Sequence, residues 1–514
     1  MKKQGRAFFF LFVLLPASGV FADVKMPAIF ADNMVLQRNM DIPVWGWADP
    51  GEQITVKLNQ RQAAAAANSQ GQWKVLLPPA AAGGPFEMTM AGKNAVVFKN
   101  VMIGDVWICS GQSNMEMNVR NSKDAAAEMA QAGHSNIRMF SVLREMSWEP
   151  KTDCHGAWIV CAPNTVAAFS AVGYFFAREL ERKLHIPIGM IHSSWGGSSA
   201  EAWSIREKLS SNPALKPIIS HFDKTAADFG KTTFEQYGQA YRDWLVAAEK
   251  SKAAGQPFAP PPMVVDPRVH HTRPTVLYNA MIAPLIPYAI TGVIWYQGET
   301  NVFNAALYQT LFPTLIESWR EQWRQGAFPF LFVQLANYKA QKSDPTESNW
   351  AELREAQMMT LSLPKTGMAV AIDLGEANDV HPKNKQDVGK RLALAAFSIQ
   401  YGQTIDCSGP IYDGALVEGD SIRIKFKHAG GGLISRDGGP LKGFAIADED
   451  KKFLWADAKI DQDTVVVSSG QVPKPAFVRY AWADNPVCNL CNKAGLPASP
   501  FRTDGPLGDN GIKP

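Results

Sequence analysis

The stretch DVWICSGQSNMEMNV, at residues 105–119, places Ser113 directly after an apolar run with the composition of a buried strand. A serine hydroxyl becomes a nucleophile when a base removes its proton and N–H groups stabilise the oxyanion that forms. The start of a helix after a strand supplies such N–H groups, but Ser113 could equally be a helix N-cap. The motif is not the G-x-S-x-G of α/β-hydrolases, because Gln112 precedes the serine and Met115 replaces the second glycine.

The base that Ser113 would need is best supplied by His381, in EANDVHPKNKQDVGKRLA. We expect this histidine in a loop between the last strand of an α/β region and its final helix, where Pro382 keeps it out of helical geometry. A loop or capping histidine is the alternative. His192 is a rival, although a histidine within an apolar strand is more often a core residue. His270 and His271 are adjacent and lack the spacing of a helical metal site.

Strand-like apolar segments alternate with amphipathic helical segments between about residues 103 and 402. This alternation predicts βαβ units and a mostly parallel sheet, whose ligand site lies beyond the carboxyl ends of the strands. A segment at about 204–275 interrupts the alternation, and we expect a partly helical insertion near the site. The loops that should converge at the sheet edge are GQSNM, SSWGGSSAEAW, QGETN and GEANDVHP.

Two further regions have the period-two alternation of strands. Residues 23–102 contain QITVKL and QWKVLL between turn signals, which indicates a small β-sandwich domain. Residues 403–514 contain SIRIKFKH and DTVVVSSG, which indicates a C-terminal β domain. The expected fold class is therefore α/β with β domains on both sides.

Residues 1–22 have a basic start, a short apolar middle and small residues near Ala22, which is typical of a secretory signal peptide. We expect an exported protein, periplasmic or secreted. Removal of Lys2, Lys3 and Arg6 would change the formal net charge from +3 to 0. Neither this charge nor the hydropathy pattern, which lacks a further run of about 18 apolar residues, suggests a nucleic-acid or membrane partner.

The chain has six cysteines, too few and too scattered to form the framework of a small disulfide-rich domain. Cys154 and Cys161 flank a short segment and are the best candidates for a disulfide. Cys488 and Cys491 have C-x-x-C spacing, but no second pair or histidine partner follows. We therefore expect no metal.

Six segments in the same order resemble the sialate O-acetylesterases, an SGNH-hydrolase-like family related to acetylxylan esterases of the serine type. The resemblance covers nearly all of the chain after residue 22. It implies a flavodoxin-like sheet and a cofactor-free serine esterase that acts on an acetylated sugar, with Ser113 as nucleophile and His381 as general base and then general acid. The segments are GDVWICSGQSNMEM, SSWGGSSAEAW, LYNAMIAPL, GVIWYQGETN, NDVHPKNKQDVGKRLA and AGLPASPFRTD.

The third member of the triad stays open between two carboxylates. The wider SGNH pattern has an aspartate three residues before the histidine, but here that position is Asn378. Asp379, two residues before His381, could contact the imidazole. Glu299 in YQGETN is the alternative that the acetylxylan esterases suggest, and one orienting acid is sufficient.

The oxyanion hole and the sugar site need hydrogen-bond donors, a cation and an aromatic surface. Glycines allow close backbone approach, and side-chain amides donate without titrating. A cation would bind a sialic acid carboxylate, and an indole could stack on a sugar ring. The candidates are the Ser113 N–H, Gly196 or Gly197, and Gln297 or Asn301 for the oxyanion hole, with Arg273 and Trp195 for the sugar.

Three functions follow from these residues. The first is an O-acetylesterase acting on O-acetylated sialic acid. The second keeps the chemistry but acts on acetylated xylan or another plant glycan. The third is a non-catalytic carbohydrate-binding homologue, which the presence of Ser113, His381 and both candidate acids disfavours.

Overall fold

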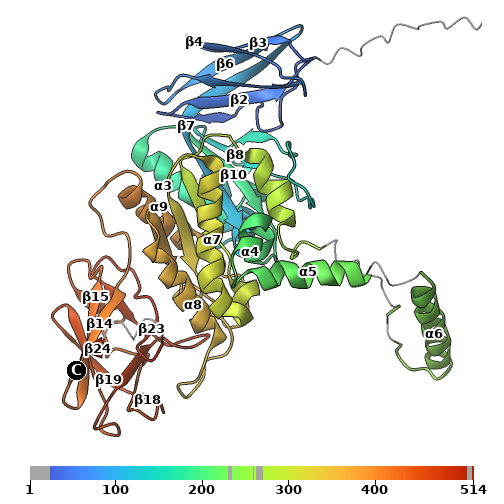
Figure 1. The fold of residues 1–514 in the computed structure, drawn as a ribbon. Coiled ribbons are helices and arrows are strands. Elements are labelled where there is room, and N and C mark those ends of the chain that lie inside the picture. Colours follow the sequence, from blue (N-terminus) through green and yellow to red (C-terminus); the bar gives the residue numbers. More distant parts are fainter. Residues whose placement is uncertain (1–22, 230–233, 259, 262–269, 506–511, 514) are drawn as a thin grey trace, which may run out of the picture.

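The structure is a computed structural model that describes residues 23–229, 234–258, 260–261, 270–505 and 512–513. The expected signal peptide, residues 1–22, lies outside the described residues. Figure 1 shows an N-terminal β domain, a central α/β domain and a C-terminal β domain in chain order.

The longest strand, β7 (Ala95–Gly111), belongs to two domains at once. Its first half pairs with β6 (Gly83–Ala91) of the N-terminal domain. Its second half lies between β10 (Ile188–Ser194) and β11 (Gly292–Tyr296). The burial of β7 alternates over the first residues and then becomes continuous, as it must when a half-exposed strand enters a sheet covered on both faces. The domain boundary expected at residues 102–103 therefore falls inside a strand.

The central sheet has the order β13-β12-β11-β7-β10-β8 with all pairs parallel, and β9 adds an antiparallel edge strand. From β7 the chain fills one side of the sheet with β8 and β10 and then the other side with β11, β12 and β13. The carboxyl end of β7 is therefore the topological switch point, where ligands bind in such sheets. In the flavodoxin-like order the first strand lies between the second and third, whereas here β10 lies between β8 and β7. The other strands are β8 (Ile137–Ser141), β9 (Trp158–Val160), β12 (Phe330–Gln334) and β13 (Thr366–Val370).

Helices cover both faces of this sheet (Figure 1). Trp107 of β7 packs edge-on against Phe176 of α3, with ring centroids 5.0 Å apart. Trp295 of β11 packs against Phe312 of α7 at 6.1 Å. Trp295 is in register with Ser110, three residues after Trp107, so these two indoles point to opposite faces. The covering helices are α3 (Ala171–Leu184) and α9 (Lys385–Ile399), which pack together, and α7 (Ala305–Trp323) and α8 (Asn349–Met359), which also pack together.

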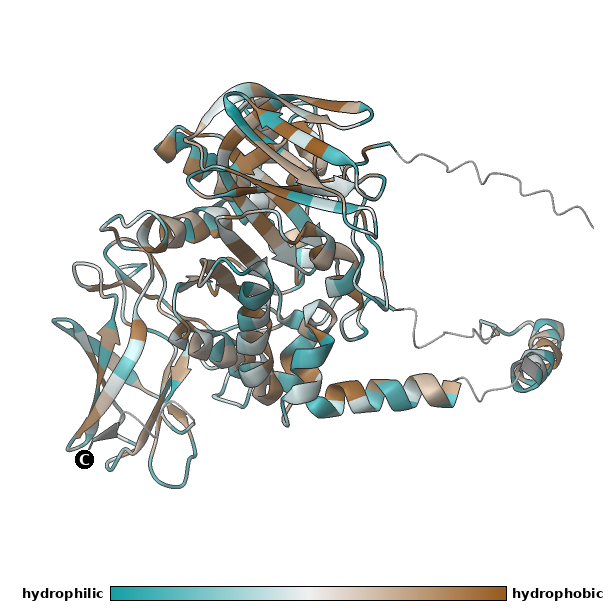
Figure 2. Cartoon of the chain, turned by 45° about the horizontal axis from the view of Figure 1, so that its top comes forward, coloured by the Kyte–Doolittle hydropathy of each residue, from teal (hydrophilic) through white to brown (hydrophobic). Residues whose placement is uncertain are grey.

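Short helices fill the loops of the central domain. They are α1 (Ser113–Glu116), α2 (Ala125–Ala130), η1 (Val119–Asn121), η2 (Val166–Ala168), η3 (Ala200–Trp203), η4 (Tyr278–Ile282), η5 (Ala283–Leu285), η6 (Glu299–Asn304) and η7 (Thr360–Ser362). The segment expected as an insertion contains α4 (Arg206–Ser211), α5 (Lys216–Phe229) and α6 (Phe234–Ala253). Figure 2 shows brown strands at the centre of the molecule and mixed colouring along α5 and α6.

The strands of the two β domains are mostly antiparallel, although β1 pairs with β7 and β14 pairs with β24 in parallel. The N-terminal domain contains β1 (Val35–Gln37), β2 (Ile42–Trp47), β3 (Gln53–Leu58), β4 (Arg61–Ala66), β5 (Gln72–Leu77) and β6. The C-terminal domain contains β14 (Ile411–Glu418), β15 (Ser421–Lys427), β16 (Leu433–Ser435), β17 (Phe444–Ala447), β18 (Leu454–Trp455), β19 (Asp457–Asp461), β20 (Thr464–Ser468), β21 (Phe477–Tyr480), β22 (Leu490–Asn492), β23 (Phe501–Arg502) and β24 (Ile512–Lys513). In the described ranges, no helix is long and apolar enough to cross a membrane.

All six cysteines are free thiols, so the expected disulfide between Cys154 and Cys161 is wrong. Strand β9 extends the chain between these residues, and the Cys161 Sγ is directed to the Ala132 carbonyl oxygen, 3.5 Å away. Both thiols are buried, and burial raises the pKa of each to about 12. They are therefore poor nucleophiles.

Candidate active site

The nucleophile candidate lies at the end of β7, where the chain turns into α1. Gly111 has φ +135°, and a Cβ atom there would lie 2.1 Å from the Tyr296 carbonyl oxygen, so the turn requires glycine. Helix α1 begins at Ser113 and its N-cap residue is Gln112, so Ser113 does not occupy the capping position. Instead its Oγ lies 2.8 Å from Nε2 of His381. The geometry matches a nucleophile and its base and not a helix cap.

The imidazole of His381 is contacted on its other side by Asp379. The Asp379 Oδ1 lies 3.4 Å from His381 Nδ1 and also accepts the His381 backbone N–H at 2.8 Å. The first distance is longer than an ordinary hydrogen bond. Both side chains are about two-fifths exposed, 41% for His381 and 43% for Asp379, so water screens the interaction. Asp379 has the position of an orienting acid.

The other candidate acid, Glu299, contacts a different residue. Its Oε1 accepts a hydrogen bond from the Asn114 side-chain amide, while Oε2 is enclosed and has no partner among the described residues. Desolvation raises the pKa of this carboxyl, although the amide of Asn114 and the nearby positive charges of Lys385 and His381 oppose the shift. Glu299 therefore contacts Asn114, the residue after Ser113, and interacts with the His381 imidazole only through long-range electrostatics.

Asn114 and Lys385 connect this carboxylate to the rest of the site. The Lys385 Nζ donates to the Asn114 Oδ1, and the Asn114 Nδ2 donates both to Glu299 and to the Val380 carbonyl oxygen. Asn114 thus joins the nucleophile turn to the loop that carries His381. Lys385 is fully buried, and desolvation lowers its pKa to about 7. A buried lysine is costly to fold, and here its ammonium group holds the side chain of Asn114, the residue that follows Ser113.

The donors expected for the oxyanion hole are placed unequally. The Ser113 N–H belongs to the first turn of α1, where no preceding turn accepts it. Gly196 lies beside the serine, but its N–H donates to the Glu116 Oε2 at 2.7 Å. The Gln297 amide bonds to Ser198 and to Asn301.

Asn301 is equally engaged, because its amide donates to both carboxylate oxygens of Glu201. Both predicted side-chain donors are thus bound to other residues and are buried, with exposures of 0% for Gln297 and 2% for Asn301. Their hydrogen bonds connect the loop of Gln297 and Asn301 to the loop of Ser198 and Glu201. Gly197 has φ +73° and lies near His271.

The rival histidine, His192, makes a hydrogen bond with the Ser194 hydroxyl at 2.6 Å. Burial lowers its pKa to about 4, so it is neutral at physiological pH. It also packs edge-on against Phe169. His192 is a half-buried residue of β10 whose ring is engaged by Ser194 and Phe169.

Ser113 and His381 both line a cavity of about 710 Å³. Its walls come from the nucleophile segment 113–122 and from the loop of Asp379, His381 and Lys383. The size suits a sugar-sized ligand. No metal-binding group of three His, Cys, Asp or Glu side chains occurs in the part of the chain that the structure describes.

Comparison with known proteins shows the family of the chain. A model of a family described as carbohydrate esterase, sialic acid-specific acetylesterase, matches residues 103–227 and 269–398. The mouse sialate O-acetylesterase is 34% identical over 426 residues, which are 75% of each chain, and the human enzyme is 32% identical over 424 residues, 74% of this chain and 72% of that protein. The chain belongs to the sialate O-acetylesterase family. It is therefore a carboxylic ester hydrolase.

A solved structure supports the same assignment for the esterase. A carbohydrate acetylesterase from Xanthomonas citri has a TM-score of 0.80 and 38% identity, and the match covers 93% of this chain and 99% of that one. The likeness therefore includes both β domains as well as the central sheet. The gap between the two matched ranges of the family model, residues 228–268, contains α6.

The predicted sugar-binding residues of the esterase lie in neighbouring loops. Trp195 stacks on His271, with ring centroids 5.3 Å apart, and Arg144 lies over the Trp195 ring at 5.7 Å. Arg273 lies over the Phe222 ring, and its Nε is buried without a partner in the described chain. Trp195 borders the nucleophile through its neighbour Gly196.

Sequence reasoning missed Glu116, Asn114 and Lys385. Asn114 and Glu116 belong to the same motif as Ser113, and Lys385 is four residues after His381. The available signal was their position next to the reacting residues. What the sequence could not indicate is that Lys385 is directed inward, because lysine at a helix start is normally solvated.

Proposed function

We propose that the esterase removes O-acetyl groups from carbohydrate, with O-acetylated sialic acid as its substrate and with Ser113 and His381 as the reacting pair. The observation that carries this proposal is the 2.8 Å contact between the Ser113 Oγ and the His381 Nε2 in a cavity open to a sugar.

The reaction then has two halves. The Ser113 Oγ attacks the acetyl carbonyl carbon while the His381 Nε2 takes the hydroxyl proton. The oxyanion is stabilised by the Ser113 N–H. When the ester bond breaks, His381 returns its proton to the sugar oxygen, leaving acetyl-serine. Water then attacks this ester while His381 takes its proton, and as the bond between the carbonyl carbon and the Ser113 Oγ breaks, His381 returns the proton to Oγ and acetate is released.

A sialic acid carries a carboxylate, and the cavity offers cations to bind it. Arg120 and Lys383 both line the cavity and are exposed, and within the described chain neither side chain is paired with a carboxylate. Such cations beside the nucleophile favour an anionic sugar. Arg273 is a further candidate, because its buried Nε lacks a partner among the described residues.

The test is acetate release by the purified chain from 9-O-acetylated N-acetylneuraminic acid and from acetylated xylan. We expect Ser113→Ala and His381→Ala each to lower kcat by at least about a thousandfold. Arg120→Gln should raise KM for the sialic acid and leave that for xylan unchanged. If Ser113→Ala hydrolyses both substrates at the wild-type rate, the nucleophile is another residue.

A second candidate substrate is a neutral acetylated glycan. The solved relative that is 38% identical is described as a carbohydrate acetylesterase, without mention of sialic acid. Faster turnover of acetylated xylan, with no effect of Arg120→Gln, would favour this candidate.

Two finer assignments accompany the proposal. The nucleophile at the carboxyl end of the first strand, with its base in the loop before the last helix, supports membership of the SGNH hydrolases. The basic and apolar composition of residues 1–22 supports export to the periplasm or outside the cell. Sequencing the N-terminus of the protein from a cell envelope fraction tests the export, and a start at Met1 would contradict it.

A further inference from the structure

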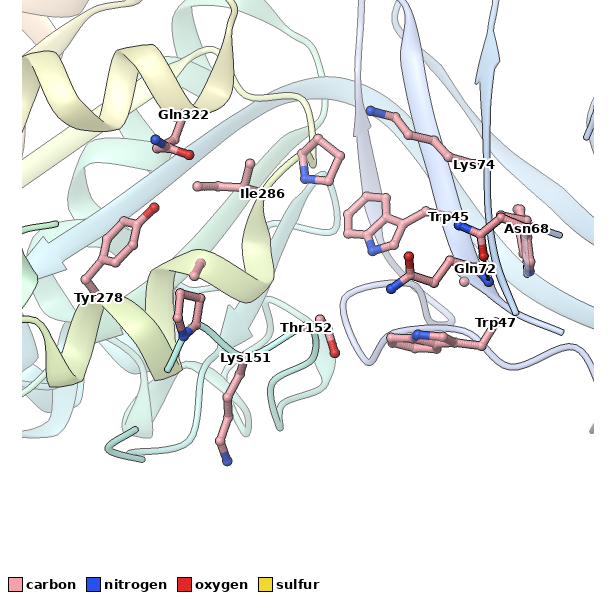
Figure 3. A pocket seen from close by; sticks show the side chains of 15 residues that line it. Trp45, Trp47, Asn68, Gln72, Lys74, Lys151, Thr152, Tyr278, Ile286 and Gln322 are labelled. Carbon is pink, nitrogen blue, oxygen red and sulfur yellow. Dashed lines mark hydrogen bonds between the residues drawn. The ribbon is translucent and has the colours of Figure 1, made fainter. Parts of the chain in front are cut away.

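A second cavity, of about 580 Å³, lies between the N-terminal β domain and the central domain. One wall is the strand pair β2–β5, and the other is formed by residues 150–152, the η4–η5 segment with Pro287, and Gln322 of α7. Figure 3 shows Trp45, Trp47 and Gln72 on one side of the cavity and Tyr278 and Ile286 on the other. A concave site of this volume at a domain boundary is typical of ligand pockets.

The side of β2–β5 that faces this cavity has an unusual composition for an outward sheet face. In β2, buried residues alternate with half-buried ones, and Trp45 and Trp47 are among the half-buried set. In register with them across the strand pair are Lys74 and Gln72, both exposed. A solvated sheet face normally carries polar side chains. Here two indoles lie among polar neighbours.

The two indoles differ in the aromatic contacts that they make with the rest of the protein. Trp45 packs edge-on against Phe30 at 4.7 Å and against Tyr288 of the central domain at 6.4 Å. Trp45 therefore also contributes to the domain contact. Trp47 makes no aromatic contact of this kind with another described residue. Its ring lines the cavity, where a ligand can pack on it.

Side-chain amides with hydrogen-bonding atoms that have no partner among the described residues line the cavity near the indoles. The Asn68 Oδ1 accepts hydrogen bonds from the Gln70 and Gln72 N–H groups in the turn before β5. The Nδ2 of the same side chain has no partner among the described residues. The side-chain amides of Gln72 and Gln322 have no partner among the described residues, and both line the cavity. Indole faces with nearby amides suit a sugar, because the C–H face of a pyranose packs on the ring while its hydroxyls bond to the amides.

This cavity is separate from the one at Ser113. It borders η4, η5 and Pro287, which precede β11, whereas Ser113 follows the carboxyl end of β7. Parallel strands place these features at opposite edges of the sheet. A sugar bound here is therefore not the acetylated unit undergoing hydrolysis.

We propose that the cavity between β2–β5 and the η4–η5 segment binds a neutral stretch of pyranose units in the glycan on which the esterase acts. This inference rests on the proposed function for the choice of a carbohydrate ligand, and on its second candidate substrate, a neutral acetylated glycan, for the kind of sugar. The N-terminal domain would then help to hold the glycan on the enzyme. The choice of a neutral stretch follows from the surroundings of Trp47, whose cross-strand neighbour is the uncharged Gln72. Two lysines also line the cavity. Lys151 is paired with Glu145, and Lys74 is in register with Trp45, whose ring already packs on Phe30 and Tyr288.

The test uses full-length Ser113→Ala protein, so that binding is measured without ester hydrolysis. Xylohexaose, cellohexaose and 3′-sialyllactose are titrated by calorimetry. We expect one of the neutral hexasaccharides to bind more tightly than sialyllactose, and Trp47→Ala to weaken that binding about tenfold. Trp455→Ala is the matched control, because Trp455 is 47% exposed on β18 of the C-terminal domain.

A second variant guards against a folding defect in β2. Thr152 is exposed on the opposite wall, so Thr152→Trp fills the cavity without altering β2–β5, and it should also weaken binding about tenfold. With Ser113 present, both variants should hydrolyse 4-nitrophenyl acetate at the normal rate.

Absence of binding by both neutral hexasaccharides, or unchanged binding in both Trp47→Ala and Thr152→Trp, would overturn the proposal. Tighter binding of sialyllactose would overturn the assignment to a neutral stretch. The proposed function fails by a different result, namely if wild-type protein releases no acetate from any acetylated sugar.

Discussion

At the scale of single residues, the site separates two carboxylates that the sequence left as alternatives. Asp379 lies 3.4 Å from the His381 imidazole, and Glu299 bonds to Asn114 instead. An acid that contacts the imidazole orients it and stabilises its protonated form, whereas an acid behind the nucleophile acts on the position of the serine turn. The two should therefore differ in the kinetic parameters that they change.

We expect Asp379→Asn to lower kcat by about a hundredfold or more, since the imidazolium loses its partner. Because Asp379 is partly exposed to water, we expect a smaller loss of kcat than for a fully buried triad acid. Glu299→Gln keeps the hydrogen bond from Asn114 and should reduce kcat less. Steady-state kinetics on one acetylated sugar compare the two, and a larger loss in Glu299→Gln would reverse the assignment.

The buried Lys385 gives a pH dependence whose sign can be worked out. Its pKa falls from the ordinary lysine value of 10.5 to about 7 in the folded protein, because burial disfavours the charged form. Between these values the unfolded chain binds the additional proton, so stability rises with pH, by up to about tenfold per pH unit in the folding equilibrium constant. Wild type should therefore gain stability relative to Lys385→Met between pH 7.5 and 9.5.

Urea unfolding of both proteins at the two pH values measures this difference. Lys390→Met, which replaces an exposed lysine on the same helix, is the control and should show no relative gain. A constant difference between wild type and Lys385→Met would mean that Lys385 keeps its ordinary pKa.

The sequence could predict that Ser113 and His381 belong to one site, where the structure brings them into contact, but it could not predict the hydrogen-bond network around them. Ser113 and His381 could be predicted because each follows a strand and because the other family-like segments occur in the same chain. The Gln297 and Asn301 amides were expected to face the substrate, yet their hydrogen bonds are used between loops. Which face of a loop an amide takes depends on packing, and no periodicity encodes it.

At the scale of elements, helix α3 is tied to the nucleophile turn by its N-cap. The Ser170 Oγ accepts the Gly173 N–H at 3.1 Å and donates to the Met115 carbonyl oxygen at 2.6 Å. The hydroxyl is fully buried. One side chain therefore starts α3 and fixes the end of α1.

Ser170→Ala should lower the free energy of unfolding by about 1–3 kcal/mol, through loss of the cap and an unsatisfied carbonyl. Because Met115 is two residues from Ser113, kcat should also fall. Thermal unfolding and steady-state kinetics give the two readouts.

Ser348→Ala is the matched control. Ser348 caps α8 by accepting the Ala351 N–H at 3.0 Å, and its other contact is Asp484. This variant should be destabilised by a similar amount with unchanged kcat. Equal losses of kcat in both variants would show that the α3 cap has no particular link to the nucleophile.

The types of the elements were largely predictable, because period-two and helical patterns differ clearly in this chain. Strand β7 shows where the pattern was misleading. Its alternating first half and its apolar second half resemble separate strands of separate domains. Only the continuous hydrogen bonding to β6 and then to β10 and β11 reveals one strand.

At the scale of the whole molecule, a buried carboxylate in β7 connects the domains. Asp105 is 2% exposed, and Arg38 of the N-terminal domain binds both of its oxygens at 2.8 and 3.0 Å. Tyr401, at the end of the central domain, donates its hydroxyl to the same carboxylate at 2.9 Å.

Asp105→Ala should lower the free energy of unfolding by about 3–5 kcal/mol, because Arg38 and Tyr401 lose a shared buried partner. Urea unfolding measures this loss. The control is Asp223→Ala, which removes a two-oxygen contact with Arg206 on the surface, where both side chains are more than two-fifths exposed. Its cost should stay below about 1 kcal/mol, and equal costs would contradict the role of Asp105.

Because one strand runs through both the N-terminal domain and the central sheet, the N-terminal domain is not an exchangeable module in the sense used by protein engineers. A chimera joined at residues 102–103 would interrupt β7 in mid-ladder. Recombination should instead be attempted in the turn between β6 and β7, at residues 92–94, so that β7 is inherited whole together with the sheet it starts.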